Sequence, residues 1–274
     1  MTTTTQIDLD ECIAQLSALD EWLPIGREVR LGPRMSALVQ WLDSRFVKLA
    51  LDAGARQLVV PRLIERSVLE RAGYFSSFPA ALPQENSGER CLPPATCYHC
   101  YATLAASRIQ ENAIWTCVAR CHRNEEIQEP GRLQTFTMRE VVLAGPADWV
   151  RSCRQEWMDR ILALAQSLGM NVALEGATDP FFGGGEARGR KLLQQLKQLK
   201  YELRARGDLH GTQLAISSFN LHETFFSRRF GFRLHDGGDA YSGCVAFGLE
   251  RWALALARAL GPEIAFRLVE QEQP

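Results

Sequence analysis

The sequence lacks an excess of charge of either sign. Its 274 residues carry 31 Lys and Arg against 32 Asp and Glu, a formal net charge of −1, so the whole chain does not present the basic surface of a nucleic-acid-binding protein. It also lacks apolar runs of the roughly 18 residues needed to cross a bilayer, and its N-terminal MTTTTQIDLDE has no signal-peptide pattern. We therefore expect a cytoplasmic protein with no membrane partner.

Glycine-rich nucleotide motifs and internal repeats are absent as well. Neither GxGxxG nor GxxxxGK[ST] occurs, which argues against a Rossmann-type or P-loop nucleotide site. The chain does contain 46% apolar residues, which is enough for a sizeable core. We expect a single domain over residues 1–274.

Hydrophobic periodicity predicts an ordered mixture of helices and strands. A helical stripe follows Pro33 and stops at Gly54, and a β-branched strand at 57–61 comes directly after it. The other predicted elements are a helix over 7–22, a hairpin of strands 113–122 and 133–143, a helix over 146–169, strands over 213–219 and 241–247, and a helix over 249–260. Because strands and helices do not alternate regularly, we expect an α+β fold with an antiparallel sheet flanked by helices.

A basic segment follows the glycine-rich FFGGG, with a helix predicted over 186–201. Between residues 183 and 207 it has seven bases and two acids, a net charge of +5. The bases are Arg188, Arg190, Lys191, Lys197, Lys200, Arg204 and Arg206. Such a segment is either a solvated helix face or a basic helical insertion that docks an acidic partner.

Eight cysteines raise the question of metal binding. The pattern Cys97-x2-Cys100-x16-Cys117-x3-Cys121 is typical of a closed four-thiolate zinc site. Against this, Cys117 and Cys121 lie in one predicted strand, about 13 Å apart by strand rise, which is too far for a shared ion. The closed quartet therefore remains only as the alternative to the arrangement described below.

Three motifs in order resemble those of class II aminoacyl-tRNA synthetases. They are the long helix with a strand ending at Pro61, CHRNE followed by FTMRE, and SGCVAFGLERW. KYEL at 200–203 and AISSFN at 215–220 are similar to the seryl-tRNA synthetase core. Few residues precede the first motif, leaving no room for a tRNA-binding arm. The chain is therefore identified as a member of the amino acid:[carrier protein] ligases, truncated relatives of the zinc-dependent archaeal seryl enzymes.

The resemblance implies the fold of a class II synthetase catalytic domain and a homodimer. It also implies ATP-dependent conversion of a small amino acid, glycine or alanine, to an aminoacyl-adenylate. The aminoacyl group would then pass to the phosphopantetheine thiol of an acyl or peptidyl carrier protein, and tRNA would not be a partner. Two alternatives stay open: a tRNA-charging enzyme like seryl-tRNA synthetase, and a non-catalytic, synthetase-like regulatory protein.

The resemblance also assigns residues to ATP and Mg²⁺. Arg123 and Arg251 would be catalytic, gripping the triphosphate. The residues implied at ATP are Arg123, Glu125, Arg132, Leu133, Glu202, Ala215, Ile216, Ser217, Ser218 and Arg251. Ala215 departs from the family pattern, which has a glutamate that binds magnesium there. Ser217, Ser218 or Glu140 would have to compensate for it.

The same resemblance implies an open Zn²⁺ site formed by Cys97, Glu140 and Cys244, with Cys100 as the alternative to Cys97. Two thiolates and a carboxylate leave one tetrahedral position for the amine of the substrate. Glu140, Asn220 and His222 are expected to bind the amino acid. Arg188, Arg190, Lys191 and Lys197 are expected to bind the acidic carrier.

Overall fold

The computed structural model describes residues 7–78, 82–110, 112–124, 130–177, 198–207 and 213–272. The helices are α1 Leu9–Ala18, α2 Pro33–Asp52, α3 Arg66–Arg71, α4 Tyr74–Ser77, α5 Cys97–Thr103, α6 Ala147–Ser167, α8 Phe225–Phe230, α9 Leu249–Leu260 and α10 Pro262–Glu272. The strands are β1 Trp22–Ile25, β2 Glu28–Leu31, β3 Arg56–Gln57, β4 Ile64–Glu65, β5 Arg90–Cys91, β6 Arg108–Ile109, β7 Ala113–His122, β8 Thr135–Gly145, β9 Val172–Ala177, β10 Lys200–Ala205, β11 Leu214–Glu223, β12 Arg233–Leu234 and β13 Tyr241–Gly248.

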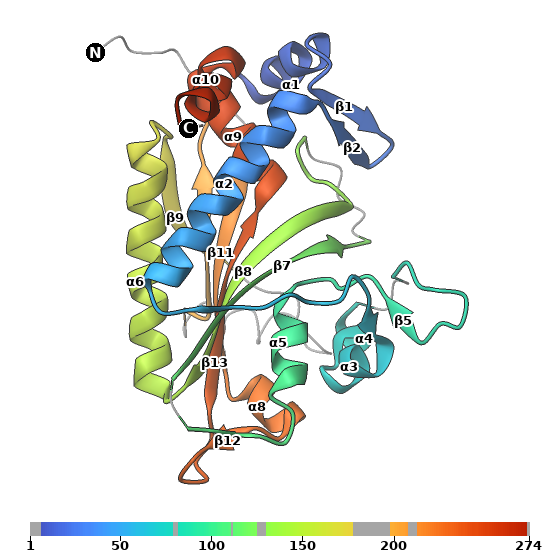
Figure 1. Ribbon diagram of the computed structural model, residues 1–274, viewed down its shortest axis with the longest axis vertical. Helices are drawn as coiled ribbons and strands as arrows, with labels where there is room; N and C mark the ends of the chain where they lie inside the picture. The colour runs from blue at the N-terminus through green and yellow to red at the C-terminus, as the bar shows by residue number, and fades with distance from the viewer. Residues whose placement is uncertain are drawn as a thin grey trace.

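A central sheet organises the described residues. Its seven strands run in the order β3-β7-β8-β13-β11-β10-β9, and every neighbouring pair is antiparallel except the short parallel pair β3 and β7. Helices cover both of its faces (Figure 1). The predicted α+β architecture is therefore confirmed.

The two faces of the sheet carry different helices. The long helices α2, α6 and α9 pack with α1 and α10 on one face and form the larger apolar core. The short helices α3, α4, α5 and α8 cover part of the other face (Figure 1). Because successive strand residues point to opposite faces, each strand of this sheet supplies side chains to both layers.

Helix α2 forms where the periodicity places it. Pro33 begins it, and its buried residues Met35, Leu38, Leu42, Phe46 and Ala50 repeat every three or four positions. The ring of Phe46 stacks on Phe247 of β13 at a centroid distance of 4.2 Å and meets Trp252 of α9 edge-on at 5.0 Å. Helix α2 is thereby packed against the strand and the helix of the third motif.

Two adjacent residues of β8 show how one strand serves both layers. Arg139, 2% exposed, reaches towards α2 and donates two hydrogen bonds to Asp43, at 2.5 and 2.8 Å. Its neighbour Glu140, 1% exposed, points to the opposite face, towards α5. The ion pair with Asp43 therefore anchors the strand that carries Glu140.

We expect Asp43→Ala to lower the free energy of unfolding by about 3 kcal/mol, because it leaves the buried Arg139 guanidinium without its carboxylate. Asp52→Ala is the matched control on the same helix, since Asp52 forms an exposed pair with Lys48 and should cost less than about 0.5 kcal/mol. Urea unfolding of both variants measures the difference. Equal losses would contradict the anchoring role.

The structure confirms most predicted elements and corrects three. The predicted helix over 7–22 ends at Ala18, and Trp22 begins strand β1. The hairpin is formed by β7 and β8, and β7 pairs over its whole length with residues 135–144 of β8. The strand predicted at 57–61 is only β3, because pairing with β7 covers two residues and Val59 is then 98% exposed. The predicted helix over 186–201 is wrong at its end, where Lys200 and Tyr201 begin β10.

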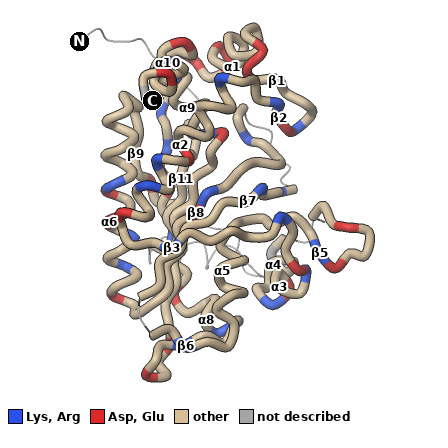
Figure 2. The backbone as a smooth tube through the Cα atoms, in the orientation of Figure 1, with Lys and Arg blue, Asp and Glu red and all other residues tan. Residues whose placement is uncertain are grey.

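Charged residues of both signs are spread along the outer segments of the chain (Figure 2). This distribution agrees with the near-zero net charge of the sequence. Among the described residues, no helix is long and apolar enough to cross a membrane.

Candidate functional site

A pocket opens on the sheet face that carries the short helices. Its polar lining comes from α5, from strands β8, β10, β11 and β13, and from the residue after β7, and consists of Cys97, Arg123, Glu140, Lys200, Ser218, Asn220, His222 and Cys244. Aromatic side chains from α4, α5 and α8, namely Tyr74, Tyr98, Phe225 and Phe226, line it as well. The pocket thus combines anionic, cationic and apolar groups at one place.

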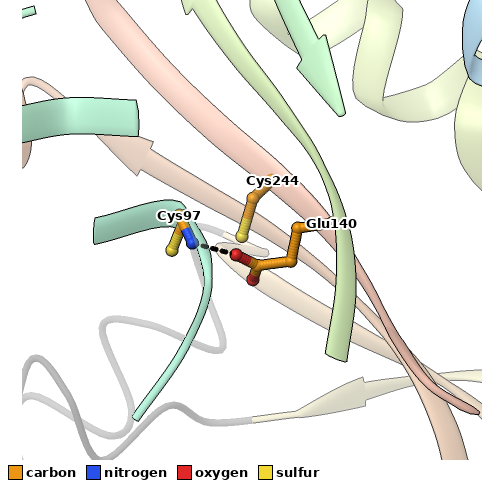
Figure 3. Close-up of side chains that lie close together, drawn as sticks. All are labelled: Cys97, Glu140 and Cys244. Carbon is orange, nitrogen blue, oxygen red and sulfur yellow. Dashed lines mark hydrogen bonds between the residues drawn. The ribbon is translucent and has the colours of Figure 1, made fainter. Parts of the chain in front are cut away.

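Three metal-ligating side chains meet at this pocket. The ligand atoms of Cys97, Glu140 and Cys244 all lie within 4.8 Å of one another, and all three residues are buried (Figure 3). Cys97 begins α5, and its backbone N–H donates to a carboxylate oxygen of Glu140. Glu140 and Cys244 lie diagonally on the paired strands β8 and β13, since Glu140 is opposite Ala246.

Burial controls the protonation of this cluster. Burial raises the pKa of Glu140 to about 7, against the lowering effect of its hydrogen bonds with Cys97. A hydrogen bond with Cys244 and burial raise the pKa of Cys97 well above its usual value. The contact from Cys97 lowers the pKa of Cys244, but burial and the charge of Glu140 give a net rise. Two thiols and a carboxyl in such a place are a donor set that a divalent cation would stabilise in the charged form.

The closed cysteine quartet does not form, although all four of its residues are described. Cys100 and Cys117 are neighbours, with sulfurs 3.4 Å apart, but Cys121 contacts the hydroxyl of Thr96 at 3.6 Å. Cys97 and Cys100 lie one helical turn apart on α5, and only Cys97 reaches Glu140 and Cys244. The choice between these two cysteines therefore falls on Cys97.

Asn220 and His222 stand beside Cys244. The side-chain amide of Asn220 donates to the Cys244 sulfur at 3.4 Å and to the Ser218 hydroxyl at 3.2 Å. The Nε2 atom of His222 lies 3.7 Å from the same sulfur, and its Nδ1 lies 3.0 Å from the hydroxyl of Tyr101. Burial lowers the pKa of His222 to about 3, so this imidazole is neutral.

Arg123 forms the cationic wall of the pocket. It follows β7, and its Nε donates to the carbonyl of Pro94 at 3.0 Å. Its guanidinium carbon lies 5.5 Å from the centroid of the Phe136 ring. Backbone and ring together hold this guanidinium at the pocket. Glu125, two residues further on, lies outside the described residues.

Arg251 is held between the hairpin and β11. Its guanidinium donates to the carbonyls of Gly131 at 3.2 Å and Ala215 at 3.1 Å. The preceding residue, the buried Glu250, accepts two hydrogen bonds from the backbone N–H of Thr137, at 2.8 and 2.9 Å. Glu250 thus fastens the first turn of α9 to the start of β8.

The other residues expected at ATP have different surroundings. Arg132 and Leu133 lie just before β8, and the half-buried Leu133 packs against the larger core. Glu202 forms ion pairs with Lys200 at 3.1 Å and Arg204 at 2.5 Å, and these two cations lower its pKa although burial opposes them. Its charge is therefore already balanced by protein groups.

A bulge in β11 separates the residues of AISSFN. The register with β10 shifts so that Ser217 pairs with Leu203 and Ala215 with Arg204. Ile216 lies in the larger core, and the Ser217 hydroxyl accepts a hydrogen bond from the buried Trp252 at 2.9 Å. The Ser217 hydroxyl therefore faces the larger core, whereas Ser218 lines the pocket. Ile216 and Ser217 can meet ATP only through their backbone.

Lys200 is a pocket residue that the sequence pattern did not predict. Lys200, Arg204 and Arg206 fall in the basic segment of the sequence, but Lys200 and Arg204 belong to β10, and Arg204 and Arg206 pair with Glu175. The alternation of KYELRA, with buried Leu203 and Ala205, was the available signal for a strand. The four proposed carrier-binding bases, Arg188, Arg190, Lys191 and Lys197, lie outside the described residues.

Comparison with known proteins decides the family. The chain is 32% identical over 244 residues to amino acid--[acyl-carrier-protein] ligase 1 of Bradyrhizobium diazoefficiens, covering 78% of this chain and 74% of that protein. The chain belongs to the amino acid--[acyl-carrier-protein] ligase family. Ligase 2 of the same organism is also 32% identical, over 75% of this chain and 70% of its own length. No family model matches the chain.

The fold of this ligase family member is that of seryl-tRNA synthetases. A type-2 serine--tRNA ligase of Methanococcus aeolicus is 27% identical over 47% of the chain and 26% of that protein. Among solved structures, seryl-tRNA synthetase from Pyrococcus horikoshii, complexed with ATP, superposes with a TM-score of 0.76 at 14% identity. The match covers 97% of this chain and 63% of that one, so the chain spans less than two thirds of this structural relative. This likeness confirms the class II catalytic fold.

Proposed function

We propose that the protein is an ATP-dependent ligase that activates a small amino acid and transfers it to the phosphopantetheine thiol of a carrier protein. The observation that carries the proposal is the meeting of the Cys97, Glu140 and Cys244 cluster with Arg123 in one pocket. A carboxylate must attack the α-phosphorus of ATP there, and the reacting groups are both anionic. A fixed guanidinium lowers that barrier electrostatically. The names of the B. diazoefficiens relatives support the carrier as acceptor.

The cation in the cluster is proposed to be Zn²⁺. Two cysteine sulfurs and one carboxylate are ligands that zinc prefers, and three protein ligands leave one position for a further donor. When bound, the ion supplies a Lewis-acid contact for the α-amine of the substrate. Cys97, Glu140 and Cys244 would hold it. Glu140 thereby contributes to amino-acid binding as well.

ATP is proposed to lie along Arg123 and Arg251, with Mg²⁺ carried on its phosphates. Arg251 is already oriented by two carbonyls, so little reorganisation is needed when the triphosphate arrives. Glu125, Arg132, Leu133, Glu202 and the backbone of 215–218 remain the proposed contacts of the nucleotide. Because Glu202 is paired with Lys200 and Arg204, we expect it to bind magnesium less tightly than an unpaired carboxylate.

Packed aromatic rings form one wall of the pocket. Tyr98 packs edge-on against Phe226 with ring centroids 5.7 Å apart, and Phe226 stacks on Tyr101 at 4.2 Å. Glycine and alanine are the proposed amino acids, because the family resemblance implies a small substrate.

A homodimer is proposed through α2 and the segment after it. Val59 is 98% exposed and Leu51, near the end of α2, is 48% exposed. A second chain packed along this part of the molecule would cover both side chains.

The carrier is proposed to dock on the basic segment that includes Arg188, Arg190, Lys191 and Lys197. Carrier proteins are acidic, so opposite charges would speed and orient their encounter. We expect the double variant Arg190→Glu and Lys197→Glu to slow carrier loading at least tenfold, with adenylate formation within about twofold of wild type. Loading and pyrophosphate exchange measured on the same preparation check this. An equal loss in both steps would argue against docking.

Amino-acid-dependent exchange of labelled pyrophosphate into ATP tests the activation step. We expect exchange with glycine or alanine and none with large amino acids. Absence of exchange with every amino acid would exclude the ligase and support the non-catalytic regulatory alternative. Exchange followed by charging of tRNA would favour the tRNA-ligase alternative, and that charging would be strongly salt-dependent.

A further inference from the structure

One acceptor atom in the pocket is not used by the protein. Asn220 is 8% exposed, and in the described part of the chain its Oδ1 has no hydrogen-bond partner. A buried amide oxygen without a partner costs free energy, so native structures rarely keep one without a reason. Asn220 lines the pocket beside Cys244, its neighbour across the strand pair β11 and β13. Its oxygen is therefore available to a ligand of the pocket.

The orientation of the amide follows from its neighbours. The nitrogen Nδ2 donates to the sulfur of Cys244 at 3.4 Å and to the hydroxyl oxygen of Ser218 at 3.2 Å. A thiolate that binds a metal can only accept a hydrogen bond, so the N–H side of the amide must face Cys244. The oxygen then lies on the other side of the same planar group, in a residue that lines the pocket.

We propose that Oδ1 of Asn220 accepts a hydrogen bond from the α-amine of the substrate and makes the site select for an amine that keeps an N–H. This inference rests on the proposed function, in which that amine binds at Cys97, Glu140 and Cys244. A primary amine that gives its lone pair to a cation still has N–H donors, and these need acceptors in a buried place. A tertiary amine has no N–H left once its lone pair is used.

The experiment compares glycine with N,N-dimethylglycine by calorimetric binding to zinc-loaded protein. The wild-type protein is expected to bind glycine at least tenfold more tightly than N,N-dimethylglycine. Asn220→Leu keeps a similar volume but removes the acceptor, so it should weaken glycine about tenfold and N,N-dimethylglycine less than threefold. Asn220→Asp keeps an oxygen acceptor and should retain the preference for glycine. Metal content and ATP affinity are measured for each variant.

The variants separate the acceptor role from the contact with Cys244. If Nδ2 alone mattered, Asp and Leu at position 220 would behave alike, and that result would overturn the inference. An unchanged glycine preference in Asn220→Leu would overturn it too. If Asn220→Leu loses its metal, the test rests on Asn220→Asp. Loss of the preference for glycine in Asn220→Asp would then refute the acceptor role. If wild type binds neither ligand and exchanges no pyrophosphate, the proposed function fails and the inference fails with it.

Discussion

Cys244→Ala is expected to purify with less than about one tenth of the zinc of the wild type and to lose measurable binding of glycine and alanine. The variant removes one of three ligands from a cluster whose members lie within 4.8 Å of one another. Loss of a ligand from a three-ligand site leaves too few donors to hold the ion. ATP affinity should stay within about threefold, because the triphosphate is proposed to lie on Arg123 and Arg251.

Cys117→Ala is the matched control for this prediction. Cys117 is as deeply buried as Cys244, but its sulfur contacts Cys100 and not the three-residue cluster. It should keep full zinc content and amino-acid binding. Metal analysis and calorimetry measure both variants. Equal zinc content in Cys244→Ala and wild type would refute the ligand assignment. Loss of zinc from Cys117→Ala would instead support the closed four-cysteine zinc site.

Arg123→Ala is expected to lower amino-acid-dependent pyrophosphate exchange by a factor of about 10² to 10³. Its guanidinium is fixed in the pocket by the carbonyl of Pro94, and the reaction brings two anions together beside it. Removing one preorganised donor to a developing charge typically costs this much. Arg123→Lys should recover only part of the rate, because a single ammonium cannot bind two oxygens in a fork.

Arg160→Ala controls for the loss of a surface arginine. Arg160 lies on α6, is 45% exposed and forms a long pair with Glu156. Its removal should leave exchange within about twofold of wild type, and zinc content should be normal in all three variants. Full pyrophosphate exchange by Arg123→Ala would contradict the proposal that the Arg123 guanidinium stabilises the transition state of amino-acid activation.

The sequence predicted the parts of the fold that depend on local periodicity. The repeat in α2 and the two β-rich segments of the hairpin are local patterns, and β7 began and ended where the pattern placed it. The strand after α2 was overestimated, because its length depends on how far β7 can pair with it. The predicted helix at Lys200 and Tyr201 failed because a run of charged residues hid the alternation of a strand.

The sequence likewise predicted only part of the candidate site. The cluster of Cys97, Glu140 and Cys244 was implied by family motifs, and the structure brings these distant residues together. The environments of Ser217 and Ser218 could not be foreseen, because a one-residue bulge in β11 decides which hydroxyl faces the core. The unused oxygen of Asn220 likewise depends on the partners of its amide nitrogen.

Transfer of a labelled amino acid to a defined acceptor tests the central claim most directly. The protein is incubated with ATP, Mg²⁺ and labelled glycine or alanine, together with carrier protein that has its phosphopantetheine arm, carrier without the arm, or tRNA. The account predicts label on the arm-bearing carrier alone, as a thioester that hydroxylamine releases. Label on tRNA, or on none of the acceptors, would contradict it.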